Sequence, residues 1–113
     1  MNCEILIDLT TLNLMVHGHW WFDLDEAVFD QERGEFRLNC SYRKKGPYNQ
    51  NLIKVTDVSE VSIDDAARIG IYNLHDFQLN GTSVVINSEF PLRITLAVGP
   101  ESKIYVSDLR AAN

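Results

Sequence analysis

Residues 12–24, LNLMVHGHWWFDL, alternate between two kinds of side chain along their length. The even positions are mainly apolar and the odd positions mainly polar. This is typical of a β-strand with one buried face, because successive side chains point to opposite sides of a sheet. The stretch therefore predicts an opening strand with Trp20 and Phe22 turned toward the core. Gly18 predicts a bulge or bend within it, so one long strand and two strands joined at Gly18 both fit the pattern.

The same two-residue period recurs further along the chain, between turn signals. Two longer runs place apolar side chains inward at every second position: Phe36, Leu38, Cys40 and Tyr42, then Leu92, Ile94, Leu96 and Val98. Asn80-Gly81 is the clearest hairpin signal, because both residues suit a tight turn with positive φ. The sequence therefore predicts an all-β fold: a single antiparallel domain over residues 1–113, built as a sandwich or small barrel of about seven to nine strands.

The sequence contains only short stretches in which apolar residues recur with helical spacing. No apolar pattern with a period of about 3.6 residues persists beyond a turn or two. The best candidate is SIDDAAR, residues 62–68, where Ser62 or Asp64 could cap a helix and Gly70 would end it. We expect at most one short helical turn, or a loop, near 62–68.

Two segments, FDLDEAVFD at 22–30 and YNLHDFQLN at 72–80, resemble each other. Each begins with an aromatic residue that is followed two positions later by leucine, and each precedes a turn and a strand. Two amphipathic hairpins of similar composition would produce this likeness. A single echo of this kind is too limited to indicate a repeat array.

The composition is that of an ordinary folded protein with an acidic surface. Hydrophobic residues make up 45% of the chain, charged residues make up 23%, and the formal net charge is -6. This charge disfavours a broad nucleic-acid surface and an anionic membrane, but it is compatible with a basic partner. The start of the chain lacks a signal-like pattern, and no apolar run approaches the ~20 residues of a spanning helix. We therefore expect a cytoplasmic protein in which Cys3 and Cys40 are reduced thiols.

The odd positions of the opening stretch carry the candidate metal ligands. On one strand, His17, His19 and Asp23 would project from the same face, and two imidazoles with a carboxylate form a ligand set that zinc and iron sites use. A complete site needs a third converging ligand and supporting hydrogen bonds, and the only other histidine is His75. His17 and His19 are therefore candidate metal ligands, and otherwise no cofactor is expected.

Trp21, Asp23 and Asp25 are the candidate binding residues. An aromatic ring beside acids on an outward face suits an exposed contact patch, although burial of Trp21 under a loop or subunit is an equal alternative. The only basic cluster, YRKKGPYNQ at 42–50, mixes basic residues with tyrosine as single-strand nucleic-acid grooves do. A solvated hairpin loop explains this cluster better, so nucleic acid is not an expected partner.

Sequence motifs for catalysis are absent: there is no Gly-rich phosphate loop, no H-E-x-x-H, no C-x-x-C and no G-x-S-x-G. The leading hypothesis is a small acidic, non-enzymatic binding module that engages a protein partner or a second copy of itself around Trp21. One alternative is a small-ligand or metal-binding domain, with or without enzymatic activity, that uses the face of His17 and His19. Another is an immunity-type neutraliser of a basic toxin.

Overall fold

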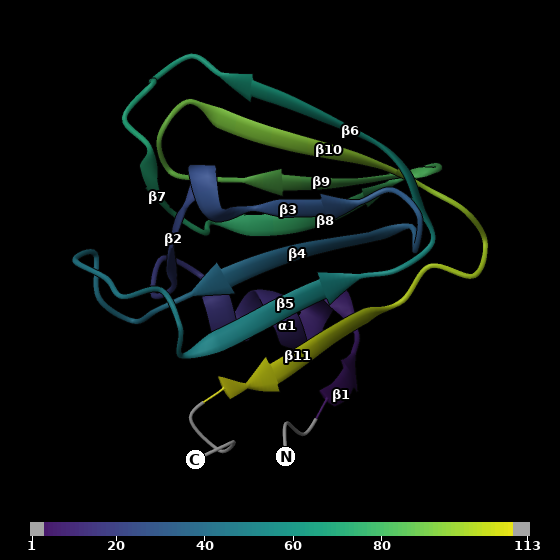
Figure 1. Ribbon diagram of the computed structural model, residues 1–113, viewed down its shortest axis with the longest axis horizontal. Helices are drawn as coiled ribbons and strands as arrows, with labels where there is room; N and C mark the ends of the chain where they lie inside the picture. The colour runs from purple at the N-terminus through teal and green to yellow at the C-terminus, as the bar shows by residue number, and fades with distance from the viewer. Residues whose placement is uncertain (1–3, 110–113) are drawn as a thin grey trace.

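Two antiparallel sheets stack face to face in the computed structural model, which describes residues 4–109 (Figure 1). The strands are β1 (Glu4–Ile7), β2 (Trp21–Asp23), β3 (Val28–Asp30), β4 (Glu35–Cys40), β5 (Asn51–Val55), β6 (Val58–Asp65), β7 (Ile71–Asn73), β8 (Asp76–Asn80), β9 (Ser83–Asn87), β10 (Leu92–Val98) and β11 (Ile104–Asp108). The helical elements are α1 (Leu9–Val16) and the 3₁₀ turn η1 (Leu24–Glu26). The five-stranded sheet has the order β1-β11-β5-β4-β3, the four-stranded sheet has the order β6-β10-β9-β8, and β2 pairs with β7.

This architecture confirms the predicted antiparallel all-β class. The described residues form eleven strands, more than the seven to nine expected, because several segments are divided into short strands such as β2, β3 and β7. The hairpin predicted at Asn80-Gly81 joins β8 to β9, with Gly81 at φ 63°. Among residues 4–109, no helix is long and apolar enough to cross a membrane.

The core lies between the two sheets, and most of the inward positions predicted from the alternation are buried. Their exposed fractions are at most 5% for six of the eight side chains: Phe36, Leu38, Cys40, Leu92, Ile94 and Leu96. In each run, the last residue that was predicted to point inward is not buried. Tyr42 follows the end of β4 and is 46% exposed, and Val98 is only half-buried after a bulge between Ala97 and Val98.

Cys40 in β4 is a free thiol with no exposed surface. Burial away from water disfavours the thiolate and raises the pKa of Cys40 far above its ordinary value. Cys40 therefore acts as a small core side chain. Cys3 lies outside the described residues.

The strand predicted from Leu12 onward is wrong in its first part, because α1 occupies it. Leu12 and Val16 are four residues apart, so they share a face in a helix as well as in a strand, and both are fully buried. Leu14 distinguishes the two structures: it would point inward in a strand, but it is 79% exposed. The Asp8 carboxylate begins the helix by accepting a hydrogen bond from the Thr11 backbone N–H (2.7 Å).

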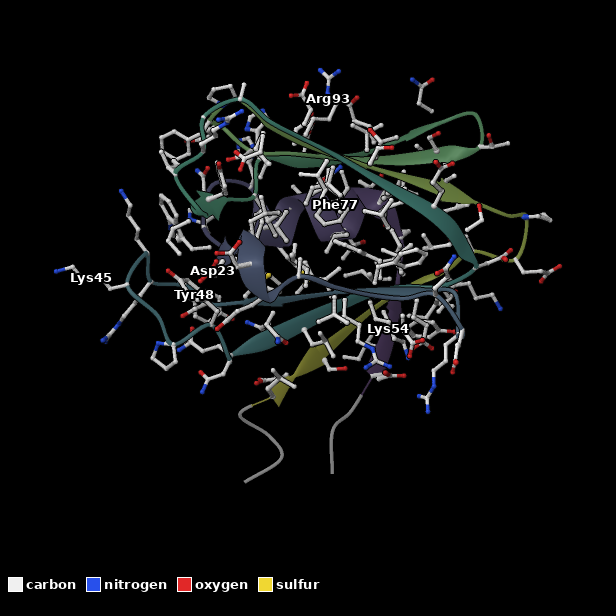
Figure 2. All side chains as sticks on the ribbon, turned by 45° about the horizontal axis from the view of Figure 1, so that its top comes forward. Asp23, Lys45, Tyr48, Lys54, Phe77 and Arg93 are labelled. Atoms are coloured by element: carbon white, nitrogen blue, oxygen red, sulfur yellow. The ribbon has the colours of Figure 1, made fainter. Side chains whose placement is uncertain are left out.

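α1 packs beside β8, the edge strand of the four-stranded sheet. Figure 2 shows the helix between the two layers, close to Phe77. Asn13 uses both ends of its side-chain amide here: Nδ2 donates to the Phe77 carbonyl oxygen (2.9 Å), and Oδ1 accepts from the Phe77 N–H (2.7 Å). These two bonds satisfy backbone groups that an edge strand otherwise leaves unpaired.

The chain turns after α1 at Gly18, whose φ of 72° lies in the left-handed region that glycine adopts readily. The Gly18 N–H donates to the Leu74 carbonyl oxygen (2.7 Å), and β2 follows. Trp20 and Phe22 are 3% and 0% exposed. The inward orientation predicted for these two rings is therefore confirmed, although a turn and a three-residue strand position them instead of one long strand.

Residues 62–68 contain no helical turn. Their first four residues extend β6, which pairs with β10 as far as the register partners Asp65 and Leu92. Beyond the strand, the Asp65 carboxylate accepts a hydrogen bond from the Arg68 N–H (2.9 Å), and Arg68 has φ 52°. The remainder of the segment is thus the loop that the sequence allowed.

Candidate functional site

The five predicted site residues lie at one end of the sandwich, the left end in Figure 1, but they do not share a strand face. His17 and His19 are exposed in the turn after α1, Trp21 and Asp23 belong to β2, and Asp25 belongs to η1. The expected common face is wrong, because only Trp21–Asp23 of this segment are extended and paired.

His17 and His75 come together in the fold although they are 58 positions apart. Their ring centroids are 4.9 Å apart, and His17 Nδ1 lies 3.2 Å from the carbonyl oxygen of His75. Glu89 Oε1 lies 4.0 Å from His75 Nδ1. Within residues 4–109, however, no group of three or more His, Cys, Asp or Glu side chains could hold a metal ion. Metal binding by His17 and His19 stays a prediction.

Trp21 is half-buried, and part of its ring is covered by its own chain. The ring centroid lies 6.3 Å from that of Phe90, and Lys44 Nζ lies 5.5 Å from the Trp21 centroid on the ring face. The second contact has the geometry of a cation–π interaction, which connects the basic 42–50 loop to β2. A partner that used the Trp21 ring would have to share it with Lys44.

The 42–50 loop also lies beside the acids of this end (Figure 2). The Tyr48 hydroxyl donates to the Lys44 carbonyl oxygen. Burial raises the pKa of Tyr48, and the nearby carboxylates of Asp23 and Glu26 raise it further. Asp23 in turn accepts a hydrogen bond from the Asp25 N–H (3.0 Å). Tyr48 of the loop is therefore close enough to Asp23 and Glu26 for their charges to act on it.

The opposite end of the sandwich contains a cavity of about 740 Å³. It lies where β1 leads into α1, where β8 turns into β9 and where β10 connects to β11, at the right end in Figure 1. Pockets for small molecules span roughly 300–1,000 Å³, so this volume is sufficient for a ligand. The apolar part of the lining consists of Leu6, Ile7, Leu9, Leu79, Val84, Val98 and Ile104.

The two ends of the sandwich differ in the size of some of their side chains. The opposite end is filled by aromatic rings, since Tyr72 packs against both Phe22 and Phe90. At the cavity end, four lining residues of the bordering connections have small side chains instead: Gly81, Thr82, Gly99 and Ser102. Small side chains leave space that neighbouring strands do not fill.

The cavity exposes apolar surface to solvent. Leu6 and Leu79 are 58% and 62% exposed, whereas Val84 and Ile104, which also line the cavity, are 3% and 7% exposed. Exposed leucines that continue into a buried apolar lining are typical of a binding site, because water is displaced from both when a ligand enters.

One acid and one base complete the lining. The Asp8 carboxylate is occupied, because it accepts the Thr11 N–H hydrogen bond, and this bond lowers the pKa of Asp8. Lys103 is held through its backbone: its N–H donates to Thr56 Oγ1 (3.0 Å), and its carbonyl accepts from the Thr56 N–H (2.9 Å). The exposed Lys103 ammonium has no carboxylate partner in the part of the chain that the structure describes.

None of the candidate binding or metal-ligating residues predicted from the sequence lines this cavity, although Gly81 and Val98 were assigned there to a hairpin turn and a buried strand face. The available signals were an apolar Leu79 directly before the tight Asn80-Gly81 turn, and the small residues of the β10–β11 connection. Neither signal shows that three connections distant in sequence meet at the same end of the sandwich. No protein-family model, curated protein or solved structure matches the chain.

Proposed function

We propose that the protein is a non-enzymatic binding module whose ligand is a small apolar molecule with an acidic end group. The observation that carries this proposal is the cavity of about 740 Å³, with Leu6 and Leu79 exposed along its apolar lining. A fatty acid is the simplest ligand of this chemistry.

Hydrophobic burial supplies the affinity, at about 25 cal/mol for each Å² of apolar surface removed from water. The border of the cavity is already held in place, which keeps the ordering cost of binding low. Asp57 fixes the β10–β11 connection: its carbonyl accepts from the Gly99 N–H (2.9 Å), and its carboxylate accepts from the Glu101 N–H (3.1 Å).

Lys103 is suited to the acidic end of the ligand. A carboxylate next to its ammonium group would accept a charge-assisted hydrogen bond. Because Lys103 is exposed, this contact contributes selectivity between an acid and its neutral ester more than it contributes affinity.

Isothermal titration with dodecanoate tests the proposal. Leu79→Glu places a charge in the apolar lining, so we expect dodecanoate affinity to fall about tenfold or more, which corresponds to about 1.4 kcal/mol. Leu14→Glu is the matched control, because Leu14 is 79% exposed on α1 and does not line the cavity. Lys103→Ala should reduce the preference for dodecanoate over methyl dodecanoate and leave ester binding unchanged.

Two results would contradict the proposal. One is a wild-type protein that binds neither dodecanoate nor its methyl ester at millimolar concentration. The other is equal weakening by Leu79→Glu and Leu14→Glu, because a ligand in the cavity contacts only the first position.

A protein-interaction role around Trp21, Asp23 and Asp25 is a second proposal. The observation that favours it is the half-buried Trp21 ring beside Phe90, which leaves aromatic surface for a contact. The cavity has stronger support, because Lys44 already lies on the Trp21 ring. Light scattering of wild type and Trp21→Ala distinguishes the two: a dimer or bound partner lost in the variant would favour the Trp21 site.

A further inference from the structure

A second hollow, of about 710 Å³, lies on the outer face of the four-stranded sheet, away from the core. It is formed by the outward side chains of β8, β9 and β10, with His75 and Ser88 at its border. Figure 2 shows Arg93 of this face pointing into solvent, whereas Phe77 of the same sheet points between the layers. Its lining is polar, in contrast to that of the apolar cavity.

One row of side chains across this face is held by hydrogen bonds. Asp76, Asn87 and Arg93 are register partners on adjacent strands. Asn87 Nδ2 donates to Asp76 Oδ1 (2.8 Å), and Arg93 Nε donates to Asn87 Oδ1 (3.4 Å). Gln78 Nε2 donates to the other carboxylate oxygen of Asp76 (2.9 Å). Hydrogen bonds therefore connect the polar groups of this row to one another in the absence of a ligand.

The neighbouring row of side chains has an apolar residue at its centre. Gln78, Val85 and Thr95 are register partners, so Val85 places two methyl groups on the floor between polar neighbours. Asn80 and Ser83 pair beyond Val85 and border the hollow on that side. The result is a small apolar floor with hydrogen-bonding groups around it.

The lining of this hollow contains charges of both signs. The row contains one carboxylate, Asp76, and one guanidinium, Arg93. Arg93 forms no ion pair within residues 4–109, although Asp64 is its register partner on β6. Its terminal nitrogens can therefore donate to a ligand, and Asp76 can accept from one. A pair of opposite charges favours a neutral ligand that both donates and accepts hydrogen bonds.

We propose that this face binds a neutral carbohydrate. A sugar ring has an apolar C–H face, which matches the Val85 floor, and a surround of hydroxyl groups, each of which donates and accepts. Arg93 and the side-chain amides would donate to these hydroxyls, and Asp76 would accept from them. This site is separate from the apolar cavity, because the two share no lining residue.

A glycan array, followed by titration with the best-bound oligosaccharide, tests the proposal. Arg93→Ala should weaken binding about tenfold, since a hydrogen bond to a charged group commonly contributes that much. Arg43→Ala is the matched control, because Arg43 is an exposed arginine in the 42–50 loop. Val85→Phe fills the floor and should abolish binding. Thermal unfolding and dodecanoate titration of each variant show whether the fold and the cavity are intact.

Three outcomes would overturn the proposal. The first is a wild-type protein that binds no glycan on the array or at millimolar concentration in solution. The second is equal binding by wild type, Arg93→Ala and Val85→Phe. The third is binding restricted to sulfated or carboxylated glycans, because the single carboxylate and single guanidinium of the lining predict a neutral ligand. None of these outcomes bears on dodecanoate binding, so the two proposals can fail separately.

Discussion

Phe22 and Tyr72 face each other in register across the β2–β7 pair, with both side chains fully buried and ring centroids 6.0 Å apart. They are also the first residues of the two similar segments, 22–30 and 72–80. Because the two strands are antiparallel, the segments leave this contact in opposite directions. One continues into the β3–β4 hairpin of the five-stranded sheet, and the other into the β8–β9 hairpin of the four-stranded sheet. The sequence likeness therefore corresponds to two hairpins that start from one aromatic contact.

Tyr72 differs from Phe22 by a hydroxyl, and this group has two partners. It donates to the Asp65 carboxylate and accepts from the Ile69 N–H (3.1 Å). Tyr72→Phe should therefore lower the free energy of unfolding by about 1–3 kcal/mol, because the Ile69 N–H loses its partner and the Asp65 carboxylate keeps only the bond from the Arg68 N–H. Urea unfolding measures this change. Tyr105→Phe is the control, since no hydrogen bond of the Tyr105 hydroxyl is found within the described residues, and equal losses would contradict the assignment.

Local periodicity predicted the strands well and failed where two periods coincide. In β4 and β10 the alternation is long enough to define a buried face, and the structure follows it. Leu12 and Val16 satisfy both the helical and the strand spacing, so apolar pattern alone could not separate them. In the structure, the Asp8 cap and the exposure of Leu14 distinguish a helix from a strand here. Only the cap is visible in the sequence, and a cap is a weaker signal than a run of alternating residues.

The candidate sites depend on contacts between distant segments, which a sequence without an alignment does not contain. Nothing local to Leu6 or Leu79 indicates that β1 and the β8–β9 turn border the same cavity. The outward residues of β8, β9 and β10 were predictable as polar faces, because Asp76, Asn87 and Arg93 alternate with core residues. Their alignment into one row required the strand order and register.

Asn13 should stabilise the fold more than an ordinary surface residue of α1. Asn13→Ala removes both hydrogen bonds to the Phe77 backbone, at a cost of about 1–2 kcal/mol. The higher helix propensity of alanine offsets about 0.5 kcal/mol of this loss. Hydrogen exchange should show faster exchange of the Phe77 amide. Thr10→Ala, an exposed substitution on the same helix, is the control, and similar exchange in both variants would contradict a role for Asn13 at the β8 edge.

The Asp8 cap predicts a pH dependence of stability. The hydrogen bond from the Thr11 N–H lowers the pKa of Asp8 below its ordinary value of 3.8. A group with a lowered folded-state pKa contributes stability above its unfolded pKa and loses that contribution as pH falls through the folded one. The wild type should therefore lose more stability than Asp8→Asn between about pH 4 and pH 2. Urea midpoints at several pH values measure this difference, and parallel pH profiles would exclude the cap as its source.

A substitution at Gly99 should disturb the β10–β11 connection, which borders the apolar cavity. A Cβ at this position would lie 2.2 Å from Asp57 Oδ2, which already accepts a hydrogen bond from the Glu101 N–H. Gly99→Ala must therefore displace the Asp57 carboxylate and break that bond, and we expect a loss of about 1–3 kcal/mol in the free energy of unfolding. The β10–β11 connection should loosen as well, so dodecanoate should bind more weakly.

A double-mutant cycle identifies the cause of this loss. Asp57 has a φ of 53°, a conformation that glycine adopts easily, so Asp57→Gly removes the carboxylate without adding backbone strain. In the Asp57→Gly background, Gly99→Ala no longer meets a carboxylate, and its cost should fall by about 1 kcal/mol or more. If Gly99→Ala costs the same in both backgrounds, the close approach of Gly99 to Asp57 is not the cause of the loss.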